Sequence, residues 1–151
     1  MMHLKKQDGW PQYVVIVGCG RLGSMLAGLL SEAGCSVVVI DINESAFDLL
    51  TAEFSGFRIV GDAVEIEILR AAKTDRADCL LATTEEDNVN LMVAQVARKI
   101  FNVPKVLARV FDPRREGIYR EFDIETVSPT NLMAEAFLAS LQNRREGQSC
   151  V

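Results

Sequence analysis

The sequence predicts an α/β domain, in which helices cover both faces of a doubly wound, six-stranded parallel sheet. Three observations support this prediction. Six short apolar runs alternate with segments of helical periodicity, a glycine-rich turn joins the first run to the first helix, and no long structureless insert interrupts the alternation. Alternating strands and helices favour right-handed crossovers and a parallel sheet buried on both faces, which is the Rossmann-like arrangement.

The strands are expected at the runs rich in Val, Ile and Leu: 13–17, 36–40, 57–60, 79–82, 105–110 and 124–127. Helices are expected between and after them, at 21–33, 43–56, 65–72, 86–101, 113–122 and 129–143. Asp112-Pro113 and Ser128-Pro129 each place a capping side chain before a proline, a pattern typical of helix starts. We therefore expect one domain at 13–143, between a flexible leader at 1–12 and a polar tail at 144–151.

The composition excludes several classes of protein. Of the 151 residues, 49% are hydrophobic and 25% are charged, which is typical of a globular domain. The longest apolar runs are strand-sized and residues 1–12 lack a signal-peptide core, so a cytoplasmic location is expected. The four cysteines show no Cys-x-x-Cys spacing, and the net charge of −5 without a basic run argues against a nucleic-acid partner.

The glycine turn carries the strongest functional signal. It reads Gly18-Cys19-Gly20-Arg21-Leu22-Gly23, and Asp41 follows Gly23 by 18 residues, at the end of the second strand. The first glycine permits the tight turn, the second lets a pyrophosphate approach the backbone, and the third lets the helix pack on the sheet. An acid at this distance can accept both ribose hydroxyls, and its charge disfavours the 2′-phosphate of NADP. The alternative is a structural turn that binds nothing.

Polar residues at the other strand ends extend the candidate site, because the carboxyl ends of parallel strands share one edge of the sheet. The complete candidate set is Gly18, Cys19, Gly20, Arg21, Leu22, Gly23, Asp41, Ile42, Asn43, Asp62, Ala63, Thr83, Thr84, Asn88 and Arg109. We expect Arg21 to clamp phosphate, with a solvated residue of the first helical turn as the alternative. Arg109 closes an apolar strand and is expected to find an anion, either a phosphate or a carboxylate across an interface.

The carboxylates and amides of this set have structural alternatives. Asp41 can cap the helix after it, and Asp62 can either accept from an adenine amino group or cap the third helix. Thr83 and Asn88 can line the site or cap the long helix. No catalytic or metal-ligating set is expected, because the one histidine is His3, in the leader, and no Gly-x-Ser-x-Gly or Walker lysine occurs.

An ordered series of motifs gives a family resemblance. Residues 18–23, Val39-Ile40-Asp41, Gly61-Asp62-Ala63, Leu69 to Asp78, Thr83-x-x-x-Asp87-Asn88-x-Asn90 and Ala108-Arg109-Val110 occur in that order. This series closely resembles the N-terminal nucleotide-binding domain of regulators of potassium conductance, the Trk/Ktr-type uptake proteins. The resemblance covers about residues 13–141.

The resemblance implies a cytosolic, non-enzymatic subunit that binds AMP, ADP, ATP or NAD(H). It implies a homodimer, often part of a ring such as an octamer, which gates a potassium-transporting membrane protein from the inner face of the membrane. In the family, the positions matching Arg21 and Arg109 contact phosphates, Asp41 the ribose and Asp62 the adenine region. Thr130 stands where some members carry an acid, which argues against metal-assisted ATP recognition.

Two alternatives stay open on the sequence alone. One is a minimal NAD-dependent oxidoreductase whose substrate site forms between subunits, and the other is the regulatory domain of a potassium–proton antiporter. The last helix has a wide apolar face, at Leu132, Met133, Ala136, Phe137 and Leu141. This face is expected either to pack on its own sheet or to form, with the long helix from Glu86, a homodimer contact.

Overall fold

The computed structural model describes residues 4–5 and 7–149, with side chains described up to residue 143. Its sheet has six parallel strands in the order β3-β2-β1-β4-β5-β6. They are β1 (Tyr13–Val17), β2 (Ser36–Asp41), β3 (Phe57–Val60), β4 (Cys79–Ala82), β5 (Lys105–Arg109) and β6 (Glu125–Val127). This confirms the predicted doubly wound parallel sheet, and each strand end lies within one residue of its expected position. The strand order reverses between β1 and β4, which is where such sheets bind ligands.

The helices differ more from the prediction. They are α1 (Arg21–Glu32), α2 (Ile66–Ala71), α3 (Asp87–Lys99), α4 (Glu116–Glu121) and α5 (Pro129–Ser149), with three 3₁₀ helices, η1 (Glu44–Leu49), η2 (Thr74–Arg76) and η3 (Pro113–Arg115). The helix expected over 43–56 is only the short η1, since Leu50 is extended and the chain then returns Phe54 to the core. The long helix ends earlier than residue 101, and Asn102 adopts a left-handed φ of 54° just after it.

The core forms two layers, one on each face of the sheet. On one face, α1 and η1 cover alternate strand residues such as Val14 and Ile16 of β1, and η1 contributes Phe47 to the same cluster. On the other face, α2, α3 and α4 cover a larger cluster that includes Leu80 and Tyr119. Strand residues are therefore buried on both sides, as expected for central parallel strands. Trp10, in the leader, packs against the α1 layer.

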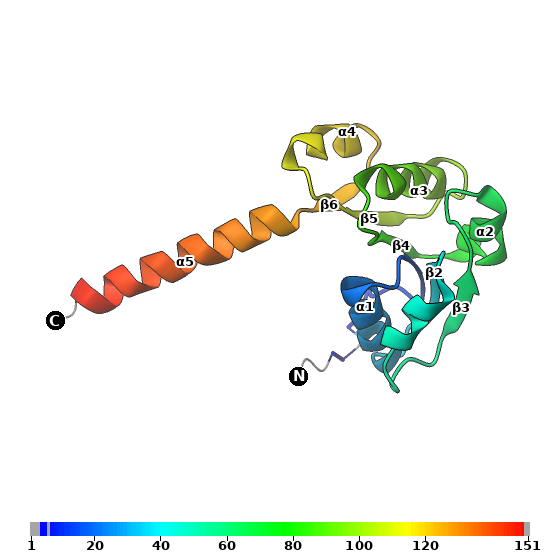
Figure 1. Ribbon diagram of the computed structural model, residues 1–151, viewed down its shortest axis with the longest axis horizontal. Helices are drawn as coiled ribbons and strands as arrows, with labels where there is room; N and C mark the ends of the chain where they lie inside the picture. Colours follow the sequence, from blue (N-terminus) through cyan, green and yellow to red (C-terminus); the bar gives the residue numbers. More distant parts are fainter. Residues whose placement is uncertain (1–3, 6, 150–151) are drawn as a thin grey trace.

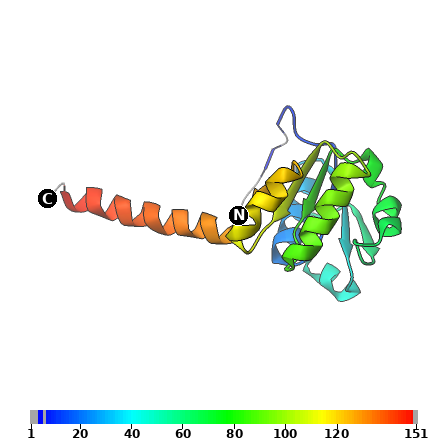
Figure 2. The ribbon, with the colours of Figure 1, turned by 90° about the horizontal axis from the view of Figure 1, so that it is seen from above.

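Helix α5 corrects two expectations. It continues to Ser149, through most of the segment expected to be a polar tail. It also does not pack on its own sheet: it leaves the domain directly after β6 and projects away from it (Figures 1 and 2). Every described side chain from Asn131 to Asn143 is exposed. The apolar face predicted from the sequence is therefore present but unpartnered within the chain.

Candidate functional site

A cavity of about 400 Å³ opens at the carboxyl ends of the strands, where the strand order reverses. We call it the strand-end cavity. Its lining residues are Val17, Gly18, Cys19, Gly20, Ile40, Asp41, Ile42, Asn43, Ala46, Leu49, Gly61, Asp62, Ala63, Thr83, Thr84, Glu85, Glu86, Val89 and Arg109. The predicted residues that do not line it are Arg21, Leu22, Gly23 and Asn88.

The glycine turn is shaped by close backbone contacts. Gly18 has a φ of +100°, and a Cβ there would lie 3.0 Å from the backbone nitrogen of Thr84. A Cβ on Gly23 would lie 1.8 Å from the carbonyl oxygen of Gly18, so only glycine allows α1 to approach the turn this closely. Gly20 is different, because a Cβ there would meet nothing within 4 Å. The space above Gly20 is open to a ligand.

The first turn of α1 faces this space without a protein cap. Gly20 is the N-cap residue and supplies no side-chain hydrogen bond to the free amides of the turn. Such amides, at the positive end of the helix dipole, form a ready anion site. Arg21 is the first residue of α1, is exposed, and makes no side-chain hydrogen bond or ion pair with the described residues. Gly23 is buried and acts through the close approach of α1 to the turn, and Leu22 is partly buried.

Asp41 ties the glycine turn to the end of β2. Its Oδ2 accepts a hydrogen bond of 2.8 Å from the Cys19 amide, and its Oδ1 accepts one of 2.9 Å from the Asn43 amide. Asp41 therefore fixes the glycine turn and the loop after β2, and it does not cap the following helix, because η1 has no side-chain cap hydrogen bond. An ionised carboxylate has about four lone-pair positions, so both oxygens can still accept from a ligand hydroxyl.

Cys19 is a structural residue beside this carboxylate. Burial, and then the charge of Asp41, raise the pKa of the Cys19 thiol to about 11. The thiol is protonated at neutral pH and is a poor nucleophile.

Asp62 also binds the backbone of its own loop. Its Oδ1 accepts a hydrogen bond of 3.0 Å from the Val64 amide, so it caps the turn that precedes α2. Asp62 and Ala63 both line the cavity, on the side formed by the end of β3. The second carboxylate oxygen of Asp62 has no partner among the described residues.

A buried network joins the ends of β4 and β5. Thr83 donates its hydroxyl to the carbonyl of Val17 or Gly18, both 3.0 Å away. Asn90 of α3 is fully buried: its Oδ1 accepts from the Thr84 amide at 3.0 Å and the Thr84 hydroxyl at 2.6 Å. Its Nδ2 donates to the carbonyls of Thr84 and Arg109, both at 2.9 Å. One carboxamide thus fixes two walls of the cavity.

The partners of Arg109 in the described part of the chain are neutral groups, so the anion expected for it stays a prediction. Its guanidinium donates to the carbonyls of Thr83 and Thr84 and lies 4.7 Å from the ring centroid of Phe111. Burial lowers the pKa of Arg109 from its ordinary value, and the nearby carboxylates of Glu85 and Asp87 oppose that shift. The side chain still lines the cavity, where it is the one cationic residue among the lining residues.

The charges of the cavity are unevenly placed. Asp41, Asp62, Glu85 and Glu86 surround its mouth, whereas the amide end of α1 provides the electropositive part. A ligand with hydroxyl and amino donors as well as a phosphate matches this arrangement better than a free multivalent anion does.

Sequence reasoning missed Asn90 as a site residue, together with Glu85, Glu86, Val89 and the apolar wall of Ala46 and Leu49. A signal for Asn90 existed. It falls on the buried stripe of α3 with Val93, Ala94 and Ala97, at helical spacing, and a polar residue on such a stripe must find buried partners. Asn88, which was predicted, instead lies outside the cavity and accepts a hydrogen bond from Arg115.

Among residues 4–5 and 7–149, no helix combines the length and apolarity needed to cross a membrane. In the same part of the chain, no three potential metal-ligating side chains lie together. Cys19, Cys35 and Cys79 are free and buried, whereas His3 and Cys150 lie outside the described residues.

Solved structures share this fold. The TrkA-N domain of the inner membrane protein ybaL from Escherichia coli superposes with a TM-score of 0.78 at 23% identity, over 88% of this chain and 98% of that one. The Shewanella denitrificans Kef CTD in its AMP-bound form gives a TM-score of 0.71 at 25% identity, over 90% and 89% of the two chains. The GsuK structure bound to ADP gives 0.73 at 24% identity, over 88% of this chain and 34% of that one.

Sequence comparisons give the family. The Trk system potassium uptake protein TrkA of Streptomyces coelicolor is 39% identical over 129 residues, which are 85% of this chain and 58% of the relative. The TrkA homolog of Methanothermobacter thermautotrophicus is 33% identical over 132 residues, 87% of this chain and 61% of the relative. This chain thus spans about three fifths of the length of these relatives. The family model of the TrkA-N domain matches residues 14–129, which confirms the predicted resemblance. The chain belongs to the TrkA-N domain family.

Proposed function

We propose that the chain is a regulatory domain of a potassium transport system, which binds an adenine nucleotide or NAD(H) in the strand-end cavity. The uncapped first turn of α1 after Gly20, with the Asp41 carboxylate beside the same glycine turn, is the observation that carries this proposal. The naming of the curated relatives as potassium uptake proteins supports the transport role. The AMP- and ADP-bound structures of similar fold support the ligand class.

Each part of the ligand has a place in the cavity. The phosphate lies at the amides of α1 with the free guanidinium of Arg21 over it, and the ribose hydroxyls donate to Asp41. The adenine lies along the apolar wall of Ile42 and Leu49, with its amino group near Asp62. A 2′-phosphate would meet the carboxylate of Asp41, so NAD is favoured over NADP.

A homodimer is part of this proposal, because two apolar surfaces of the chain lack partners. On the α1 side of the sheet, Leu81 of β4 and Leu107 of β5 are only partly buried, since no helix among the described residues covers them. The apolar face of α5 is exposed, and the helix projects away from the sheet (Figure 1). In a pair of chains, each α5 packs on the other chain and buries apolar area that one chain alone leaves in water.

The network around Asn90 provides a route from ligand to dimer. Thr84 and Arg109 line the cavity and share the Asn90 carboxamide. Arg109 pairs in register with Val127 of β6, and α5 begins two residues later, at Pro129. A ligand that binds more tightly to one arrangement of Thr84 and Arg109 therefore favours one orientation of α5 relative to the sheet. Only a difference in affinity between the two dimer geometries can produce regulation.

Calorimetric titration with AMP, ADP, ATP, NAD, NADH and NADP tests the binding step. We expect at least one nucleotide without a 2′-phosphate to bind, and NADP to bind less tightly than NAD. Arg21→Ala should weaken binding about ten- to a hundredfold, from loss of a charged hydrogen bond of about 1.5–3 kcal/mol. Asp41→Asn removes the charge and one of the two oxygens that accept from the Cys19 and Asn43 amides, and should also weaken binding.

Two exposed residues outside the cavity give matched controls, Lys99→Ala for the arginine and Asp48→Asn for the acid. Both should bind nucleotide as the parent chain does. Absence of binding by all six ligands would refute the nucleotide proposal. Steady turnover of NADH with small carbonyl substrates would instead support an oxidoreductase.

A further inference from the structure

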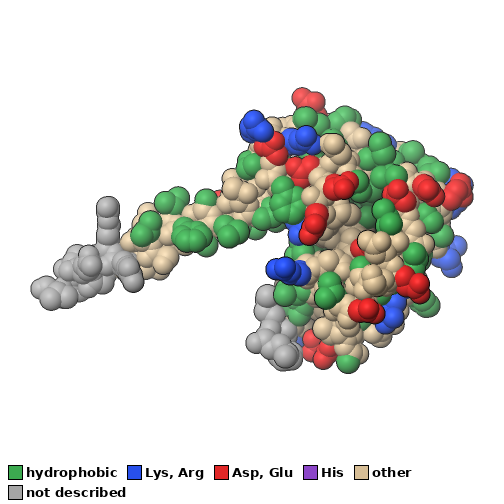
Figure 3. Space-filling view, in the orientation of Figure 1, with side chains coloured by type: hydrophobic (Ala, Val, Ile, Leu, Met, Phe, Trp, Pro, Cys, Tyr) green, Lys and Arg blue, Asp and Glu red, His purple; other side chains and the backbone are tan. Residues whose placement is uncertain are grey.

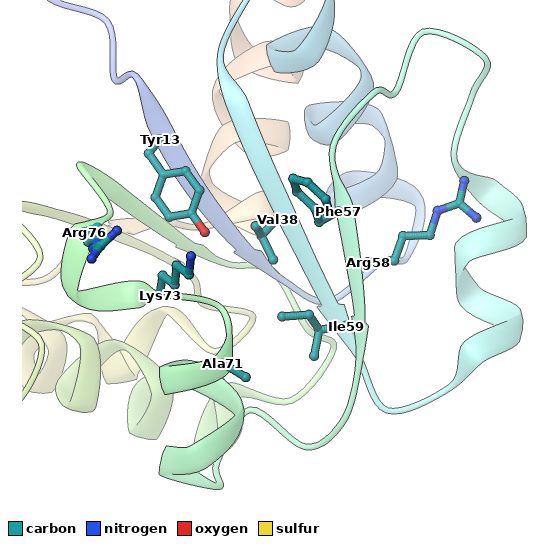
Figure 4. Close-up of a pocket in the computed structure, with 8 residues that line it drawn as sticks. All are labelled: Tyr13, Val38, Phe57, Arg58, Ile59, Ala71, Lys73 and Arg76. Atoms are coloured by element: carbon teal, nitrogen blue, oxygen red, sulfur yellow. The ribbon is translucent and has the colours of Figure 1, made fainter.

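A second cavity, of about 570 Å³, opens at the opposite end of the sheet. We call it the basal cavity, because its lining residues lie at the amino ends of the strands (Figure 4). Tyr13 is the first residue of β1 and Phe57 the first residue of β3, whereas Lys73 and Arg76 follow α2. The strand-end cavity shares none of these residues, so the two cavities are separate.

The basal cavity exists because α2 is too short to cover the sheet. This helix has six residues and ends at Ala71, and the chain then turns at Lys73, whose φ is 54°. Phe57 and Ile59 alternate along β3 and face the same side as Val38, which pairs with Phe57. These side chains form an apolar wall that the chain leaves open, and Phe57 is 76% exposed.

The mouth of the basal cavity is cationic. The Lys73 ammonium and the Arg76 guanidinium form no hydrogen bond or ion pair with the described residues. Lys73 ends near the Tyr13 hydroxyl, and Arg76 lies farther out, beyond Lys73 (Figure 4). That hydroxyl donates to the carbonyl of Ala72. Arg58, although a lining residue, points away from this group of side chains (Figure 4).

Two carboxylates lie nearby, but neither forms an ion pair with Lys73 or Arg76 among the described residues. Asp75 is close enough to add to the rise in the pKa of Tyr13 that burial causes. Asp78 accepts hydrogen bonds of 2.9 Å from the amides of Gln12 and Tyr13. The donors of Lys73 and Arg76 therefore stay available at the mouth of the cavity. An apolar wall beside unpaired cations matches a ligand that is apolar at one end and anionic at the other.

We propose that the basal cavity binds a small amphipathic anion, with an aromatic or short alkyl body against Val38, Phe57 and Ile59. Its terminal carboxylate or phosphate lies at Lys73 and Arg76. The volume is within the range of about 300–1,000 Å³ that small-molecule sites occupy. The site is independent of the nucleotide proposal, because the two cavities share no lining residue.

A series of ligands with one apolar body tests the proposal. The probes are 4-phenylbutyrate, 4-phenylbutyl phosphate, 4-phenylbutan-1-ol and 4-phenylbutylamine, titrated into ¹⁵N-labelled full chain and followed by amide NMR shifts. We expect the two anions to shift the amides of Phe57, Lys73 and Arg76 in a saturable way. The alcohol should bind about tenfold more weakly and the amine more weakly still. The carboxylate and phosphate arms distinguish the two sources of charge, and inorganic phosphate alone should not bind.

Variants separate the two halves of the ligand. Lys73→Gln combined with Arg76→Gln should weaken the anions about five- to tenfold and leave the alcohol unchanged, because only the charge is removed. Phe57→Ala should weaken the anions and the alcohol alike. All three side chains are exposed, so folding should be preserved, and unchanged AMP titration and thermal unfolding verify this.

Lys99→Gln and Phe137→Ala are the matched controls, since they change an exposed cation and an exposed phenylalanine elsewhere. Neither should alter binding. Anions that bind no better than the amine, or shifts confined to α5 or the strand-end cavity, would overturn the proposal. Binding that is insensitive to the double glutamine variant would overturn it as well.

Discussion

The sheet domain and helix α5 place their apolar residues in opposite environments. In the sheet, Val14, Val15, Ile16 and Leu80 are 0% exposed. Along α5, the large apolar side chains are 54–68% exposed, and they form a band along the projecting helix (Figure 3): Leu132, Met133, Phe137, Leu138 and Leu141. The same chain therefore contains one region that completes its own core and one that does not.

This difference predicts that the sheet domain determines the folding of one chain, whereas α5 determines the association of two chains. The sheet domain buries most of its apolar core within one chain, so its stability should depend only weakly on protein concentration. Asn131 of α5 donates to Glu116 of α4 at 3.1 Å, and the side chains from Leu132 to Asn143 are exposed. An isolated helix of this length is marginal in water. Its helicity should therefore rise as dimers form. Each prediction below acts on one region and should leave the other unchanged.

The largest effect is expected for a core truncation in the sheet. Leu80→Ala removes a fully buried side chain from β4 and should lower the free energy of unfolding by about 2–5 kcal/mol. Phe137→Ala, on α5, should change it by less than about 0.5 kcal/mol in dilute protein. Urea denaturation at low micromolar protein measures both. Equal losses would mean that α5 belongs to the folding unit of the single chain.

A charge on the apolar face of α5 should act on assembly instead. Phe137→Glu places a carboxylate in the proposed dimer contact and should weaken dimerisation by about 2–4 kcal/mol, with an unchanged free energy of unfolding of the monomer. Sedimentation equilibrium measures the association. Gln142→Glu adds the same charge on the polar side of α5 and is the control. A parent chain that stays monomeric at high micromolar protein would contradict the dimer.

The contrast also explains what the sequence could predict. The six strands were predictable, because a parallel strand buried on both faces needs a continuous run of apolar and β-branched residues. The glycine turn and Asp41 were predictable, because their spacing follows from a turn, a helix and a returning strand. Helical periodicity likewise predicted an apolar face on α5. It could not predict which surface that face contacts, since periodicity carries no information on the direction of a helix after β6.

The hydrogen-bond partners of side chains at the cavity were harder to predict than the places of these residues in the fold. The sequence placed Arg109 at a strand end, but its carbonyl partners come from a loop 25 residues earlier and depend on the approach of β4 and β5. In the same way, the roles of Asn88 and Asn90 depend on which side of α3 faces the sheet. Two positions apart on a helix means nearly opposite faces, so only one of the two could line a buried network.

The two asparagines provide a matched pair for the sheet domain. Asn90→Ala removes the shared partner of the Thr84 amide, the Thr84 carbonyl and the Arg109 carbonyl, and should lower the free energy of unfolding by about 1–3 kcal/mol. Asn88→Ala, on the exposed side, should cost less than about 0.5 kcal/mol. Chemical denaturation compares them. We also expect Asn90→Ala to weaken the effect of nucleotide on dimerisation, since the variant removes the link between Thr84 and Arg109.

The smallest effect is an alkaline loss of stability confined to the sheet domain. Tyr119 is fully buried and donates its hydroxyl to the Asp87 carbonyl at 2.6 Å. Burial, and then the charge of Asp87, raise the pKa of Tyr119 from 10.0 to about 12. The folded chain therefore keeps this proton at a pH where the unfolded chain releases it. The stabilisation is complete below pH 10 and is lost as the pH rises from 10 to 12.

Tyr119→Phe tests this assignment, because phenylalanine fills the same space and does not titrate. The variant should be less stable at neutral pH, from loss of the hydrogen bond, but its urea midpoint should fall less steeply between pH 10 and pH 11.5 than that of the parent. The dimerisation constant should not follow the same curve, because residues 129–143 contain no tyrosine, cysteine or lysine. Parallel pH profiles of unfolding for parent and variant would show that Tyr119 is not the source. A matching alkaline change in dimerisation would show that α5 and the sheet domain are coupled more tightly than their exposure indicates.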